Sequence, residues 1–203
     1  MQLDVQDYWN KVERAVRSSG KGHHIVDNFD KRRVLVEALL KYPLQDAKIV
    51  ELGTGLGLTA HVLGLTNGRL AYTGVDISQT FADAAKKHFG LSVVVKDVTD
   101  GLPFADGVAN ALFAFDVLEH IAPEHREKLW GEIDRILDKK ERIIFINNPL
   151  DESGHNEKYD FGLDETDIAK LAVATGTRIV EVKILQPENR HYQFIVLAKA
   201  WPG

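Results

Sequence analysis

Three glycines close together in the sequence could hold a bound ligand against the main chain. The segment Glu51–Gly57 reads ELGTGLG, with Gly53, Gly55 and Gly57 directly after the apolar run KIVEL. Glycine adopts backbone angles that other residues resist, and it lets a ligand approach the main chain closely. Dinucleotide-binding turns read G-x-G-x-x-G, which would place the third glycine at position 58, where this chain has Leu58. The turn therefore predicts a ligand site, and its spacing argues against a nicotinamide cofactor.

Acidic residues follow three more strand-like runs. Asp76 ends YTGVD, 19 residues after Gly57, while Asp97 follows VVVK and Asp116 follows LFAF. An acidic residue about 20 residues beyond the glycine turn can accept hydrogen bonds from ribose hydroxyls. Because the carboxyl ends of parallel strands border one crevice, these carboxylates are expected to line it together. Such a crevice suits a cationic ligand better than a pyrophosphate.

Histidines are the candidate proton acceptors, since the imidazole pKa lies near neutral pH. His120 follows the fourth strand-like run, and His155 lies after the fifth with Tyr159 nearby. We predict His155 or His120 as the general base, with Asp116 orienting the acceptor. His120 and His125 lack the one-face helical spacing of a zinc site, so no metal is predicted. Cysteine is absent, which excludes thiolate nucleophiles, disulfides and cysteine-ligated metals.

The elements that must position these residues follow from the pattern of apolar runs. From Ala47 onward, short apolar runs alternate with helical stretches, which is typical of a parallel sheet covered on both faces. The last two runs, RIVEVKIL and YQFIVLAKA, are separated only by QPENRH, so they should pair antiparallel. We predict an α/β, Rossmann-like fold: an open, mostly parallel seven-stranded sheet with helices on both faces and an antiparallel C-terminal hairpin. Asn147-Asn148-Pro149 is expected to be a loop after the fifth strand.

The first 45 residues read as two helices that such a sheet does not need. We expect a single domain in which residues 1–45 form a helical lid and residues 46–203 form the cofactor-binding core. In that lid Tyr8, Trp9 and His23 would face the crevice, where an aromatic ring attracts a cation. The alternative is that Tyr8 and Trp9 attach the first helix to the sheet.

Composition limits the class of protein. The 203 residues are 44% hydrophobic with a formal net charge of −5, which suits one domain with its own core. The negative charge argues against a nucleic-acid partner. No apolar run reaches the roughly 18 residues of a membrane helix, and the N-terminus lacks the features of a signal peptide. We expect a cytoplasmic protein with no membrane partner, and the sequence leaves homo-oligomerisation open.

Taken together, the motifs resemble those of class I S-adenosylmethionine-dependent methyltransferases, over roughly residues 47–200. ELGTGLG resembles the first motif of the family, GVDIS its ribose-binding acidic motif, and KDVTDGLPF the loop that holds the adenine. FDVLEHI resembles the fourth-strand motif of the small-molecule branch. The segment from Asn147 to Gly176 resembles that branch as well, because a histidine and an aromatic residue precede the next helix.

The resemblance implies S-adenosylmethionine as the cofactor and assigns roles residue by residue. Glu51 would support the methionine amino group or the turn, and Asp76 would bind the ribose hydroxyls. Ile77 would pack on the adenine, and Phe115 would sit near the transferable methyl. In similar enzymes a Glu-His pair stabilises the turn into the next helix, which is the alternative role for His120. The complete set of expected cofactor-binding residues is Glu51, Gly53, Thr54, Gly55, Gly57, Asp76, Ile77, Asp97, Val98 and Phe115.

We predict an enzyme that transfers a methyl group to an oxygen or nitrogen of a small-molecule acceptor. One alternative is a catalytically silent, methyltransferase-like module that binds a partner, because a fold does not guarantee chemistry. A second is a nicotinamide-dependent oxidoreductase, against which the glycine spacing and the reversed terminal hairpin argue.

Overall fold

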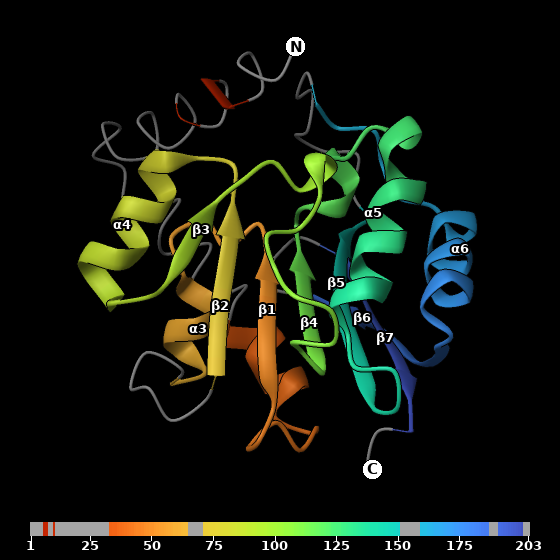
Figure 1. Ribbon diagram of the computed structural model, residues 1–203. Coiled ribbons are helices and arrows are strands. Elements are labelled where there is room, and N and C mark those ends of the chain that lie inside the picture. The colour runs from red at the N-terminus through yellow and green to blue at the C-terminus, as the bar shows by residue number, and fades with distance from the viewer. Residues whose placement is uncertain are drawn as a thin grey trace.

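A computed structural model of the chain describes residues 6–7, 10, 33–64, 71–150, 159–186 and 191–200. Strands and helices alternate in the order that the sequence predicts (Figure 1). The strands are β1 (Lys48–Leu52), β2 (Ala71–Asp76), β3 (Val93–Val95), β4 (Ala111–Phe115), β5 (Arg142–Pro149), β6 (Arg178–Leu185) and β7 (Tyr192–Lys199). The helices are α3 (Leu58–Val62), α4 (Gln79–Phe89), α5 (Pro123–Ile136) and α6 (Glu165–Thr175), with the 3₁₀ turns η2 (Val98–Asp100) and η3 (Leu118–His120). Residues 33–39 are also helical.

The strands form one seven-stranded sheet in the order β3-β2-β1-β4-β5-β7-β6. The pairs from β3 through β5 are parallel, whereas β7 pairs antiparallel with both β5 and β6. This arrangement confirms the predicted fold class, including the reversed C-terminal hairpin. The strand order changes direction between β1 and β4, and in such sheets ligands bind outside the carboxyl ends at that point. These ends point upward in Figure 1.

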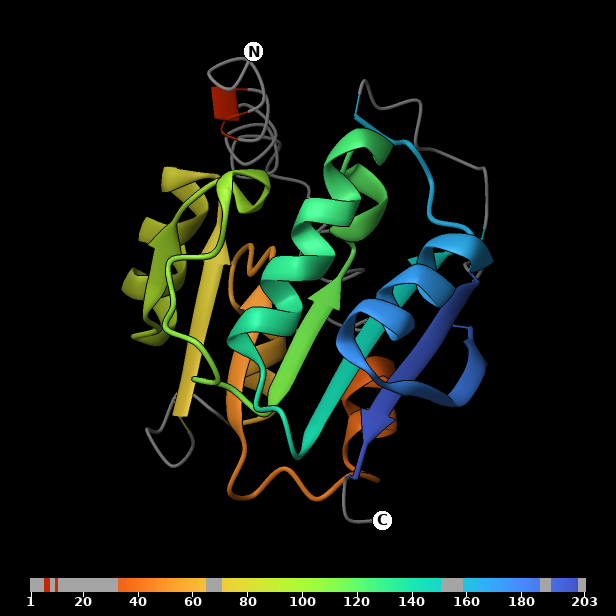
Figure 2. The ribbon, with the colours of Figure 1, turned by 45° about the vertical axis from the view of Figure 1, so that its right-hand side comes forward.

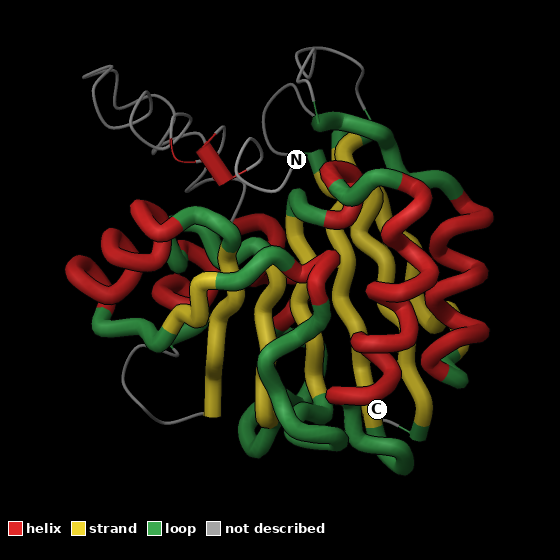
Figure 3. The backbone as a smooth tube through the Cα atoms, turned by 45° about the horizontal axis from the view of Figure 1, so that its top comes forward, coloured by secondary structure: helices red, strands yellow, loops and turns green. Residues whose placement is uncertain are grey.

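The core lies in two layers because the central strands are apolar on both faces. On one face, residues such as Leu52, Leu112 and Ile144 pack against α5 and α6. On the other face, Phe113 and Phe145 pack with residues of the 33–39 helix and of α3. Figure 2 shows α5 and α6 in front of the sheet with the 33–39 helix behind it, and Figure 3 shows the strands side by side between the helical layers.

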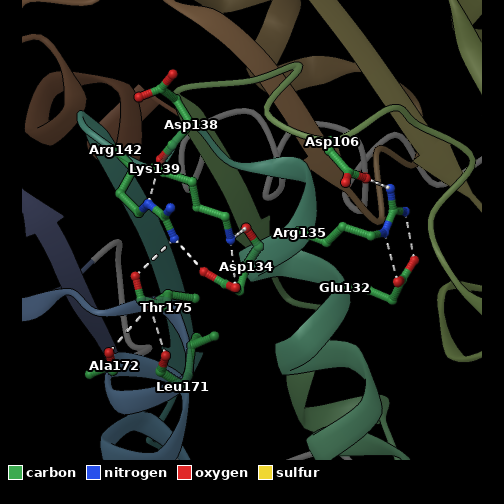
Figure 4. Close-up of polar contacts among 10 residues, drawn as sticks. All are labelled: Asp106, Glu132, Asp134, Arg135, Asp138, Lys139, Arg142, Leu171, Ala172 and Thr175. Carbon is green, nitrogen blue, oxygen red and sulfur yellow. Dashed lines mark hydrogen bonds and ion pairs between the residues drawn. The ribbon is translucent and has the colours of Figure 1, made fainter.

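A buried arginine ties α5, β5 and α6 together at the amino end of β5 (Figure 4). The Arg142 side chain is 1% exposed, so its charge requires partners inside the protein. Its Nη1 donates to Asp134 Oδ1 at 2.7 Å and to the Thr175 carbonyl oxygen at 2.8 Å. Its Nε donates to the Asp138 carbonyl oxygen at 2.6 Å. These bonds fix the helices whose other ends border the crevice.

The expected loop Asn147-Asn148-Pro149 is instead the last part of β5, so that prediction was wrong. The three residues pair antiparallel with Phe194, Gln193 and Tyr192 of β7. The pairing of β5 with β4 ends at Asn147, whereas its pairing with the antiparallel strand β7 continues to Pro149 and keeps β5 extended. Among the described helices, none combines the length and the apolar character needed to cross a bilayer.

Candidate functional site

The glycine turn after β1 is shaped by three left-handed residues. Gly53, Gly55 and Gly57 have φ angles of 65°, 53° and 78°, a region that side-chain-bearing residues rarely adopt. A Cβ atom on Gly53 would lie 2.8 Å from the Val117 Cβ, and one on Gly57 would lie 2.3 Å from the Leu91 Cδ1. At Gly55 no atom of the described residues comes within 4 Å of such a Cβ. The described residues therefore leave space beside the half-buried backbone of Gly55, in the middle of the turn.

Thr54 locks the turn onto the neighbouring strand β2. Its amide donates to the Val75 carbonyl oxygen at 3.1 Å, and its hydroxyl donates to the Glu51 carbonyl oxygen at 3.3 Å. A Cβ on Gly74 would lie 2.2 Å from the Thr54 hydroxyl oxygen, so only glycine fits opposite it. Thr54 is itself buried, so its role is to support the turn. The space next to the turn lies at Gly55.

Asp76, at the carboxyl end of β2, bridges the turn and the following helix. One carboxylate oxygen accepts the Gly55 amide at 2.7 Å, and the other accepts the Ser78 amide at 2.8 Å. Burial raises the pKa of Asp76 from its ordinary value of 3.8 to about 6, although the two amide hydrogen bonds act in the opposite direction. The site thus holds a carboxylate close to the open middle of the turn, with a raised pKa.

Glu51 is the second buried acid near the turn. It lies on β1, where it is 2% exposed, and it accepts a hydrogen bond from the hydroxyl of Tyr72 on β2. Tyr72 was not among the residues expected at the site. The sequence contains no local signal for this contact, because it depends on the lateral pairing of β1 with β2.

The carboxyl end of β3 continues into η2, which Asp97 caps. The Asp97 carboxylate accepts the Thr99 amide at 2.9 Å and the Thr99 hydroxyl at 2.7 Å. Val98 follows in the buried first position of the turn. The structure places these two residues at the end of the strand next to β2, where the sequence predicts the adenine loop.

Two polar residues of the N-terminal segment contact the loop after β2. Gln6 donates its Nε2 to the Ile77 carbonyl oxygen at 2.9 Å. Asn10 Oδ1 accepts the hydroxyls of Ser78 at 2.7 Å and Thr80 at 3.2 Å. Gln6 and Asn10 therefore lie next to the loop that follows Asp76. The predicted lid residues Tyr8, Trp9 and His23 lie outside the described residues, as does His155.

Asp116 and Asn147 meet at the ends of β4 and β5. Asn147 is 2% exposed and donates its Nδ2 to Asp116 Oδ1 at 2.9 Å. Asp116 has a φ of 54°, unusual for a residue with a side chain, and such strain concentrates at functional sites. Phe115, one residue earlier, is 1% exposed and its ring lies 5.3 Å from that of Phe113 in the core. A ligand at the end of β4 would thus meet Asp116 and the Phe115 backbone.

His120 is held by the segment that precedes α6. Its Nδ1 lies 2.9 Å from the Tyr159 carbonyl oxygen. A carbonyl only accepts, so Nδ1 is the donor and Nε2 carries the lone pair when the ring is neutral. The Phe161 amide also donates to the Glu119 carbonyl oxygen at 2.9 Å. The structure therefore brings the predicted His120 and Tyr159 together, with the histidine in a defined tautomer.

Arg126, which was not among the expected site residues, stabilises the segments that meet at this contact. It is buried on α5, where its Nε donates to the Ile121 carbonyl oxygen at 2.9 Å. Its guanidinium also bonds to Asp167 of α6 and to the Gly162 carbonyl oxygen. Ile121 is next to His120, and Gly162 lies three residues after Tyr159. Arg126 therefore fixes the backbone near both ends of the hydrogen bond between His120 and Tyr159. Spacing along α5 could have shown that Arg126 shares a face with Leu129 and Trp130.

Within the described part of the chain, no three histidine, cysteine or acidic side chains gather as a metal site. The prediction that the protein binds no metal stays a prediction.

Comparison with known proteins links this geometry to a family. Residues 50–145, which contain the glycine turn, Asp76, Asp97 and Asp116, match the model of a family described as a methyltransferase domain. No curated protein matches the chain significantly.

Solved structures share the fold at low sequence identity. Magnesium protoporphyrin IX methyltransferase from Synechocystis PCC 6803, solved with bound S-adenosylmethionine, has a TM-score of 0.73 and 16% identity over 98% of this chain and 97% of that chain. A putative methyltransferase in a complex with the Haloferax volcanii Trm112 methyltransferase activator has a TM-score of 0.70 and 17% identity over 93% and 97%. The (4+2)-cyclase SpnF has a TM-score of 0.63 and 15% identity over 83% and 81%.

The matched segment contains the glycine turn and the acidic strand ends, and the shared fold extends over nearly the whole chain. Residues 50–145 thus match a methyltransferase-domain family model, and the fold of the chain is that of solved S-adenosylmethionine-dependent methyltransferases.

Proposed function

We propose that the protein transfers a methyl group from S-adenosylmethionine to an oxygen or nitrogen of a small-molecule acceptor. The observation that carries this proposal is the Asp76 carboxylate, which lies 2.7 Å from the Gly55 amide beside the open middle of the turn. A buried acceptor of this kind suits ribose hydroxyls, and the open backbone suits the methionine portion.

The residues present fit the cofactor in three regions. Gly53, Gly55 and Gly57 would let the methionine portion pass, with Glu51 nearby as a carboxylate for its amino group. Asp76 would accept the ribose hydroxyls. The adenine would contact Ile77, Asp97 and Val98 at the ends of β2 and β3. When bound, the cofactor supplies an electrophilic methyl group on a sulfonium.

The ends of β4 and β5 would then serve the acceptor. Asp116, oriented by Asn147, would accept a hydrogen bond from the acceptor's O–H or N–H. His120 presents Nε2 as its basic nitrogen because Nδ1 donates to the Tyr159 carbonyl. His155, the base favoured from sequence, remains the second candidate. Holding acceptor and methyl donor in line supplies much of the acceleration in such reactions.

A small-molecule acceptor is supported by the similar fold of the protoporphyrin methyltransferase and by the net charge of −5. The negative charge disfavours a nucleic-acid acceptor. Residues 1–45, as the predicted lid, would cover the acceptor and exclude water. Gln6 and Asn10 support this placement, since both contact the loop after Asp76.

A second candidate is a protein of this fold that does not transfer methyl groups. It is favoured by one observation: a (4+2)-cyclase shares the fold at a TM-score of 0.63. One fold can support many different reactions. The residues that would bind the acceptor therefore decide between methyl transfer and another function.

The test uses cofactor labelled with tritium in the methyl group, incubated with the protein and with separate small-molecule and macromolecular fractions of a cell extract. We expect label to move into a low-mass product only in the presence of the protein, and the Asp76→Ala variant to abolish the transfer. Label in protein or nucleic acid would overturn the small-molecule assignment. Absence of transfer, together with intact cofactor binding, would favour the second candidate.

A further inference from the structure

We propose that two copies of the chain pair through the outer edges of their β6 strands, antiparallel, with the two-fold axis at Val182. The sheet would then continue from one copy into the other.

The first observation is the sheet edge at β6, which carries both charged and apolar side chains. β6 is the last strand in the sheet order, and no described strand pairs with its outer side. Four of its apolar side chains are about half exposed: Ile179 at 48%, Val180 at 45%, Val182 at 51% and Ile184 at 46%. Proteins normally blunt such edges with short strands, charges or covering segments, because unpaired backbone groups attract other strands. The opposite edge, β3, follows this rule, since it has only three residues.

The second observation is how the β6 side chains divide between the two faces. Glu181 and Lys183 lie opposite Val196 and Phe194 of β7, both of which belong to the core on the side of the 33–39 helix. Val182 lies opposite Ile195, which belongs to the core on the side of α5 and α6. Between Glu181 and Ile184, β6 therefore presents charges on one face and apolar side chains on the other.

These two faces select one register. With the axis at Val182, Glu181 of each copy faces Lys183 of the other. Moving the register by two residues in either direction places Glu181 opposite itself or Lys183 opposite itself. A shift by one residue would set charged side chains against the apolar face. Opposite charges on paired strands stabilise a sheet and like charges destabilise it, so the charges favour the register at Val182.

Two neighbouring residues already contact the Glu181 carboxylate within the chain. The Tyr42 hydroxyl donates to its carboxylate, and Lys41 Nζ lies 3.7 Å away. The bulge between Ile179 and Glu181 interrupts regular pairing with β7, so the regular part of the proposed contact is limited to residues 181–183. On the apolar side, α6 packs beside β6 and its Val173 is 82% exposed, which adds apolar surface next to the strand.

Such a pair closes on itself, because each copy offers the same edge to the other. Two strands, β5 and β7, separate β6 from β4. Pairing would therefore leave the ends of β1 and β4 accessible, and it does not depend on the proposed function.

Sedimentation velocity over a range of protein concentrations tests the proposal. We expect the wild-type chain to reach the mass of two chains as concentration rises. Lys183→Glu places two acids opposite each other and should weaken the dimer at least about tenfold. Glu181→Lys should do the same. An equimolar mixture of the two variants should restore a dimer, because each copy then supplies the charge that the other lacks. Lys87→Glu is the matched control, because Lys87 is exposed on α4, which packs against β3 at the opposite edge of the sheet. This variant should leave the dimer unchanged.

Val182→Asp supplies a second disruption that leaves Glu181 and its Tyr42 contact intact. In hydrogen exchange, amides of β6 should become more protected as the wild-type concentration rises. A wild-type chain that stays monomeric throughout would overturn the proposal. A dimer that Lys183→Glu leaves unchanged, or a mixture of the charge variants that stays monomeric, would overturn it as well.

Discussion

The Gly55 amide donates a 2.7 Å hydrogen bond to the Asp76 carboxylate, which joins the turn after β1 to the end of β2. Burial raises the pKa of Asp76 to about 6, so cofactor binding through this carboxylate is expected to depend on pH. The ionised carboxylate accepts two ribose hydroxyls better than the protonated acid does.

We therefore expect the affinity for S-adenosylhomocysteine to fall roughly tenfold between pH 7 and pH 5, as the ionised fraction of Asp76 falls by about that factor. Calorimetric titration at several pH values measures it. Asp76→Asn should bind weakly with little pH dependence over this range. A wild-type affinity that is flat from pH 7 to pH 5 would contradict the ribose-binding role.

The contribution of Asp76 to the free energy of unfolding should change with pH in the opposite direction to the affinity for S-adenosylhomocysteine. Its pKa is about 6 in the folded protein and near 3.8 in the unfolded chain, so the folded state binds the proton more tightly. Its contribution to the free energy of unfolding is therefore fully present below pH 3.8 and is lost as pH rises through 6. Comparing urea unfolding of the wild-type chain and Asp76→Asn across this window isolates that contribution.

Asn147 is predicted to act on the acceptor through Asp116. Hydrogen bonds to a charged group contribute about 1.5–3 kcal/mol, so Asn147→Ala should lower kcat/KM for the acceptor by roughly 10- to 100-fold. The Kd for S-adenosylhomocysteine should hardly change. Asn110→Ala is the matched control, because the Asn110 side chain bonds to the Lys48 amide at the amino end of β1. If Asn147→Ala and Asn110→Ala have equal kinetic effects, Asn147 is only structural.

The N-terminal segment is predicted to cover the bound cofactor. Asn10→Ala removes the acceptor for the Ser78 and Thr80 hydroxyls and should weaken S-adenosylhomocysteine binding about threefold to tenfold. Asp7→Asn, an exposed neighbour, is the control and should have no effect. Deletion of residues 1–22 should lower turnover further. A shortened chain that folds, binds and turns over normally would exclude a lid.

The two candidate bases can be separated once an acceptor is known. Loss of the base should lower kcat by roughly 10²–10⁴ at saturating cofactor, with the S-adenosylhomocysteine affinity almost unchanged. We compare His120→Ala and His155→Ala, with exposed His88→Ala on α4 as the control. If His120 only stabilises its turn, His120→Ala should lower the melting temperature without a large fall in kcat. If neither variant slows the reaction tenfold, catalysis is by positioning alone.

The sheet, its reversed hairpin and the glycine turn were predictable because their signals are local. RIVEVKIL coincides with β6, and Gly53, Gly55 and Gly57 occupy the left-handed positions that the motif requires. Asp76 was predictable from its distance to the turn.

The contacts that complete the site were not predictable, because they join residues far apart in the sequence. Asn147 and Asp116 meet only through the pairing of β4 with β5, and Asn10 reaches Ser78 across 68 positions. Asn147 was assigned to a loop because the sequence does not show how far β7 extends along β5. Arg126 was not among the expected site residues, because its partners lie on α6 and on the segment before it.

Calorimetric titration with S-adenosylhomocysteine and with NAD tests the central claim most directly. We predict that S-adenosylhomocysteine binds at a single site, that NAD does not bind, and that Asp76→Ala weakens S-adenosylhomocysteine binding at least about tenfold. Binding of NAD without binding of S-adenosylhomocysteine would contradict the account.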